Sequence, residues 1–67
     1  MTTRNLNDAL TNYDAHSTLS YVDPIARAAA RRDAIAAINN ASADDLARAR
    51  RVFRYEPAII ALLEEVL

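Results

Sequence analysis

The C-terminal stretch EPAIIALLEEVL, residues Glu56 to Leu67, decides how this chain folds. Proline has no N–H to donate and disfavours helical geometry in the residue before it, so a preceding helix ends near Glu56 and a new helix begins at Pro57. We therefore predict a helix over 57–67. When its residues are placed at 100° intervals around the helix axis, this helix has an unusually broad apolar surface. That surface comprises Ile59, Ile60, Leu62, Leu63, Val66 and Leu67.

The breadth of that apolar surface predicts a second subunit. Ordering residues 57–67 costs on the order of 16 kcal/mol, at about 1.5 kcal/mol per residue. Full burial of the six large aliphatic side chains returns roughly 9 to 18 kcal/mol, so leaving Ile60 and Leu67 in water would let the helix fray. The other predicted helices of one chain cover one side, and a second copy is the simplest cover for the other. The predicted homodimer interface comprises Ile59, Ile60, Leu63, Val66 and Leu67.

A cationic helix is predicted immediately before Pro57, over 43–55. Ser42 stands three residues before Asp45, a spacing that resembles a capping box with Asp in place of Glu or Gln. The predicted core side comprises Leu46, Ala49 and Phe53. The opposite half presents a candidate partner-binding surface, which comprises Arg48, Arg50, Arg51, Arg54 and Tyr55.

A further helix is predicted over 24–39. Asp23 caps its first turn, and Pro24 is tolerated at the first helical position. Asn39 and Asn40 end it, because Asn is the usual substitute for Gly in a left-handed cap. We expect the main core face to comprise Ile25, Ala28, Ala29 and Ile35, with Ile38 at its edge. A second ridge of small side chains, which would let another helix approach closely, comprises Ala26, Ala30, Ala34 and Ala37.

The N-terminal third is predicted to be an arm and connector over 1–22, followed by a helical core over 23–67. A narrow apolar stripe between Thr3 and Tyr13 favours a short helix that docks onto the core, although three asparagines weaken the pattern. From Tyr13 to Val22 we expect an ordered connector. The apolar residues expected to touch the core there are Leu19, Tyr21 and Val22.

Composition supports a single all-α domain. Fifteen of the 67 residues are Ala and none is Gly, a combination that favours helix and makes tight hairpin turns difficult. A chain of this length is only marginally stable alone, and the absence of Cys excludes disulfide support. The predicted fold is a small all-α bundle of three main helices, about 24–39, 43–55 and 57–67, with a possible short N-terminal helix and a dimeric assembly.

The sequence offers few groups for catalysis or metal binding. Without Gly there is no phosphate-cradling loop or glycine-framed nucleophile elbow. His16, the single imidazole, lies too close in sequence to Asp14 and Ser17 for the geometry of a catalytic triad. The acidic pairs, Asp44-Asp45 and Glu64-Glu65, are explained by helix capping and by solubility. We therefore expect no enzyme activity, metal, cofactor or small-molecule substrate.

The function predicted from these features is that of a small protein-binding regulator. No secretory signal and no membrane-spanning segment is read, so the predicted location is the cytoplasm. The arginine and tyrosine surface would occlude an acidic surface on a larger protein, as an antitoxin, an anti-activator or a phage-encoded inhibitor does in bacteria or phage. The alternative is a dimeric DNA-binding transcriptional regulator that uses helix 43–55, although the acids at the start of that helix would meet phosphate badly. A third interpretation is an ordinary solvated face, neutralised by Asp33, Glu64 or Glu65.

Overall fold

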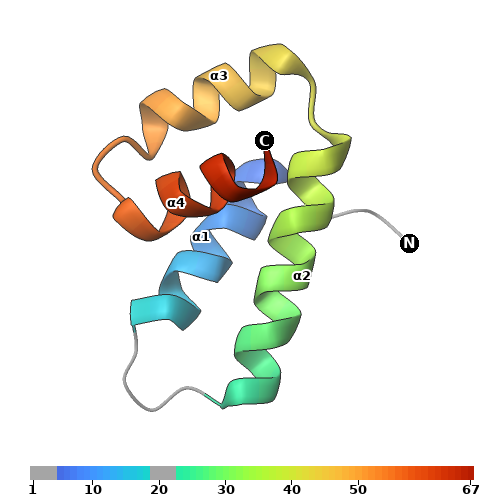
Figure 1. The fold of residues 1–67 in the computed structure, drawn as a ribbon, viewed down its shortest axis with the longest axis vertical. Coiled ribbons are helices and arrows are strands. Elements are labelled where there is room, and N and C mark those ends of the chain that lie inside the picture. Colours follow the sequence, from blue (N-terminus) through green and yellow to red (C-terminus); the bar gives the residue numbers. More distant parts are fainter. Residues whose placement is uncertain (1–4, 19–22) are drawn as a thin grey trace.

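The computed structural model describes residues 5–18 and 23–67, and within these ranges the fold is a compact arrangement of four α-helices. The all-α class predicted from the sequence is confirmed. Figure 1 shows α1 and α2 side by side and α3 lying across one end of the molecule, and α4 packs against both α1 and α2. No helix of the described part is long and apolar enough to cross a membrane. The helices are α1 (Leu6–Thr18), α2 (Pro24–Asn40), α3 (Ala43–Val52) and α4 (Pro57–Val66).

Helix α1 continues to Thr18, so the connector predicted from Tyr13 onward is wrong for residues 13–18, which are helical. The helix begins at Leu6, where its first turn has an effective cap. The backbone N–H of Asp8 donates to the side-chain oxygen of Asn5 at 2.8 Å, and the Asn5 amide donates back to the Asp8 carboxylate at 3.1 Å. This reciprocal pairing satisfies groups that the start of a helix leaves free. The asparagine that weakened the sequence pattern therefore starts the helix. The predicted core contacts of Leu19, Tyr21 and Val22 lie outside the described residues.

Helix α2 begins as predicted, with the Asp23 carboxylate accepting a hydrogen bond from the Ile25 N–H at 3.0 Å. Its predicted left-handed cap is wrong, because the described residues contain no positive φ angle. Instead, the Asn40 side-chain amide donates to the Ala36 carbonyl at 2.9 Å, which satisfies one of the free acceptors at the helix end. Ala41 then leaves the helix in an extended conformation.

The predicted main core face of α2 is wrong at Ile25, Ala28 and Ala29, but Ile35 packs partly buried against the core and Ile38 is buried. Of the predicted ridge of small residues, Ala30, Ala34 and Ala37 are buried and Ala26 is partly buried. Ile25 is 78% exposed, and Ala28 and Ala29 are exposed as well. The ridge allows α1 to approach closely, and α1 with α2 forms the most extensive helix pair. Alanines occur on every side of α2, so its sequence pattern could not distinguish the two faces. The buried residues of α2 are Ala30, Ala34, Ala37 and Ile38.

Helix α3 ends at Val52, three residues earlier than predicted. Phe53 leaves the helical conformation, and the Glu56 N–H donates to the Phe53 carbonyl at 2.9 Å, closing a turn. Pro57 explains this end, since its ring disfavours helical geometry in the preceding residue and it has no N–H with which to continue the ladder. Helix α4 begins at Pro57, as the sequence predicts.

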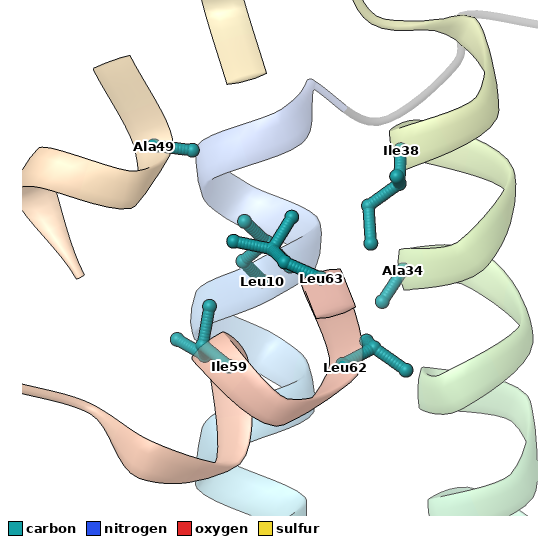
Figure 2. Packing of buried hydrophobic residues seen from close by; sticks show 7 residues of the cluster. All are labelled: Leu10, Ala34, Ile38, Ala49, Ile59, Leu62 and Leu63. Carbon is teal, nitrogen blue, oxygen red and sulfur yellow. The ribbon is translucent and has the colours of Figure 1, made fainter. Parts of the chain in front are cut away.

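The core is built around α4. Ile59, Leu62 and Leu63 are each 1% exposed, and they pack with residues of α1, α2 and α3. In Figure 2, Leu62 points toward Ala34 of α2, and Leu63 lies close to Leu10 of α1. Helix α1 therefore packs against α4 within the same chain, whereas Leu67, for which the sequence predicts cover by a second subunit, is 60% exposed. The seven buried residues of this cluster are Leu10, Ala34, Ile38, Ala49, Ile59, Leu62 and Leu63.

We predict that Leu63→Ala lowers the free energy of unfolding by about 2 to 5 kcal/mol, because it removes a fully buried side chain and leaves a cavity. The whole stability of a chain this size is on the order of 3 to 10 kcal/mol, so the variant should be close to unfolded at room temperature. Urea denaturation followed by circular dichroism measures the change. Leu67→Ala is the matched control, since Leu67 is 60% exposed and its truncation should cost much less. Equal losses in the two variants would contradict this core.

Candidate partner-binding surface on helix α3

Helix α3 is attached to the core by a narrow apolar stripe. Ala49 is completely buried, and Leu46 and Phe53 are partly buried against the core cluster. The first turn is fixed by Ser42, whose hydroxyl accepts a hydrogen bond from the Asp45 N–H at 3.1 Å. The most extensive contacts of α3 are with α1. One side of the helix is thus held in place and the other faces solvent.

All five residues of the predicted partner-binding surface are exposed. Tyr55 is 80% exposed, and the four arginines lie on α3 or on the turn that follows it. The structure therefore brings these side chains to one end of the molecule. We call the set of Arg48, Arg50, Arg51, Arg54 and Tyr55 the cationic surface.

The acidic residues expected to neutralise the cationic surface form no ion pair with it in the described structure. Glu65 instead pairs with Arg31 of α2, and this is the ion pair found among residues 5–18 and 23–67. Both of its side chains are substantially exposed, so the pair contributes little to stability. Asp33 and Glu64 are exposed. The guanidinium groups of α3 are left available to an acidic partner.

Arg54 and Tyr55 form an interaction that helical periodicity did not predict. The Arg54 guanidinium carbon lies 4.8 Å from the centroid of the Tyr55 ring, within the range of a cation–π contact. Both residues follow the last residue of α3, so their arrangement depends on the turn over residues 53–55. This stacking restricts two long side chains at the end of α3.

Val52 is a surface residue that the sequence prediction missed. It is 59% exposed, although large apolar side chains usually contribute to a core. The sequence could have predicted this exposure. When the residues of α3 are placed at 100° intervals around the helix, Val52 lies outside the stripe formed by Leu46, Ala49 and Phe53. The end of α3 therefore presents apolar area together with positive charge.

An open hollow of about 310 Å³ adjoins the cationic surface where the start of α1 approaches α3. Arg48 contributes to both features. The lining is part polar and part apolar and carries both signs of charge, and the described residues contain no cluster of side chains suited to hold a metal ion. The sequence could not indicate this hollow, because it depends on the packing of two helices far apart in the chain. Its lining residues are Asn5, Leu6, Asn7, Asp8, Asp45 and Arg48.

The side chains of His16 and Ser17 are engaged within α1. The His16 ring Nδ1 donates to the Asn12 carbonyl at 2.8 Å, and the Ser17 hydroxyl donates to the Tyr13 carbonyl at 2.9 Å. Each side chain therefore bonds to the backbone one turn earlier in the same helix. Neither is directed toward the other in the manner of a nucleophile and its base.

The fold and surface define a small all-α protein with one exposed, arginine-rich helix end. No family model, no curated protein and no solved structure matches this chain. Its function must therefore be inferred from its own surface chemistry.

We predict that Ala49→Leu displaces α3 and lowers the free energy of unfolding by about 1 to 3 kcal/mol, because the position is fully buried and has no room for a larger side chain. Thermal denaturation measures the loss. Ala47→Leu is the matched control, since Ala47 is exposed on the same helix and leucine favours helix nearly as well as alanine. If Ala49→Leu proved as stable as Ala47→Leu, α3 would not be anchored through this contact.

Proposed function

We propose that this protein is a non-enzymatic regulator that binds another protein and occludes an acidic surface on it through the cationic surface. The observation that carries the proposal is the set of four exposed guanidinium groups on α3 and the turn that follows it, none in an ion pair within the described ranges. The opposite side of α3 holds the helix to the core. Arginine forms strong, oriented hydrogen bonds with carboxylates, and arginine and tyrosine are enriched at protein interfaces. An antitoxin, an anti-activator or a phage-encoded inhibitor would each suit a chain with such a surface.

The distribution of charge along α3 favours a protein over DNA as the partner. Asp44 and Asp45 occupy the first turn and are exposed, whereas the arginines begin at Arg48. A recognition helix contacts the major groove with its N-terminal residues, where these two carboxylates would be repelled by phosphate. The acids are well placed for α3 itself, because negative charge at a helix N-terminus is stabilised by the helix dipole.

We predict that the double variant Arg48→Glu/Arg51→Glu loses the partner protein without losing the fold. The two side chains are exposed, so the change should alter stability little, whereas reversing two charges at an interface repels an acidic partner. Affinity capture from the native cell, with the wild type and the variant as baits, measures the loss by mass spectrometry. Circular dichroism checks the fold.

The matched control is Arg32→Glu, which reverses an exposed arginine on α2, away from the cationic surface. It should retain the partner. A protein captured equally by the wild type and the double variant would contradict the proposal. Recovery of DNA in place of protein, with affinity that falls steeply as salt increases, would identify the DNA-binding alternative.

The proposed homodimer rests on a smaller surface than the sequence indicated. Ile59 and Leu63 are covered by the chain's own helices and have almost no area left for a second copy. Ile60 and Val66 are partly buried, and Leu67 is 60% exposed. An interface through α4 therefore uses these three residues.

We predict that wild-type protein at micromolar concentration has the mass of a dimer in light scattering, and that Ile60→Ser shifts it toward the monomer by placing a hydroxyl in the interface. The shift should occur with little loss of helix, since Ile60 is only partly buried in one chain. A monomeric wild type, unchanged in size by Ile60→Ser, would contradict the dimer and leave the proposed partner binding intact.

A further inference from the structure

We infer that the partner segment bound by the cationic surface is acidic and also carries a large apolar side chain, which packs against Val52 and Tyr55. This inference rests on the proposed function and adds the chemistry of the segment that is recognised. It depends on the apolar area that the structure reveals among the arginines. Charge alone would leave that area without a role.

The apolar area lies within the same few residues as the positive charge. Val52 is 59% exposed and Tyr55 is 80% exposed, and they are two of the four large exposed hydrophobic residues in the described structure. On a helix, Arg48 and Val52 are four positions apart and therefore neighbours. A segment that pairs with Arg48 thus passes close to Val52. The other two exposed residues, Ile25 and Leu67, lie on α2 and at the end of α4.

The stacked pair of Arg54 and Tyr55 prepares this surface for a mixed contact. The guanidinium group covers the tyrosine ring with its centre 4.8 Å from the ring centroid, yet the tyrosine as a whole is 80% exposed. Most of the ring is therefore available to an apolar side chain, while Arg54 retains donors for a carboxylate. Restricting both side chains in advance lowers the entropy lost on binding.

The acids at the start of α3 limit where an acidic segment can lie. Asp44 and Asp45 repel carboxylates at that end, so the segment occupies the second half of α3 and the turn that follows. The helix dipole does not attract carboxylates there, because the C-terminal end of a helix carries partial negative charge. The arginine side chains must supply the attraction, and apolar contact supplies affinity that salt screens less.

Two synthetic helical peptides test this inference directly. One carries glutamates flanking a leucine, and the second has serine in place of that leucine with the same charge. The leucine peptide should bind the full chain about tenfold more tightly, the ratio that corresponds to about 1.4 kcal/mol. Fluorescence anisotropy of labelled peptides measures both affinities. Equal affinities would overturn the inference while leaving a purely electrostatic version of the proposed function standing.

Variants of this chain give the second arm. Tyr55→Ser and Val52→Thr should each weaken the leucine peptide by about three- to tenfold and leave the serine peptide nearly unchanged, because each removes apolar area but no charge. Ile25→Ser is the matched control, being an equally exposed hydrophobic residue on another helix. If Tyr55→Ser and Val52→Thr had no more effect than Ile25→Ser, the inference would be wrong. Preference for duplex DNA over both peptides would overturn the inference and the proposed function together.

Discussion

The packing of α4 against α1 and α2 is the constraint on which the rest of the structure depends (Figure 1). Ile59, Leu62 and Leu63 lie at its centre and are almost completely buried. A chain of 67 residues has a small core, so a large share of its stability comes from these few side chains. The turn before Pro57 makes the arrangement possible, because it reverses the chain and returns the apolar helix to the core.

The packing of α3 on the core also determines which of its surfaces is available. The apolar stripe of α3 contacts the core through Ala49, and Leu46 and Phe53 complete it. The arginines lie on other sides of the helix and face solvent. A net charge of −1 for the whole chain therefore conceals a strongly cationic region, since the acids of the described structure lie elsewhere or stabilise helix starts. The local electrostatic potential at this end of the molecule is therefore opposite in sign to the net charge of the chain.

Much of the fold and part of the candidate site could be predicted from local signals. Asp23-Pro24, Ser42 and Pro57 start α2, α3 and α4 because each acts on the backbone within one turn of its position. Exposure of the four arginines also followed from periodicity, since Leu46, Ala49 and Phe53 define the opposite side. Helix ends were harder to predict. The hydrogen bond from the Asn40 side chain ends α2, and the turn at Phe53 ends α3. The sequence pattern alone does not show whether these hydrogen bonds or further helical turns are more stable.

The sequence by itself determined that this chain is all-α, where three of its helices begin, and that α3 has a cationic side, because capping, proline and helical periodicity act over a few residues. Only the tertiary structure decided which side of the alanine-rich α2 is buried, that α1 covers α4, and that Arg54 stacks on Tyr55 beside an exposed Val52. These features depend on contacts between segments far apart in the chain or on the geometry of a turn.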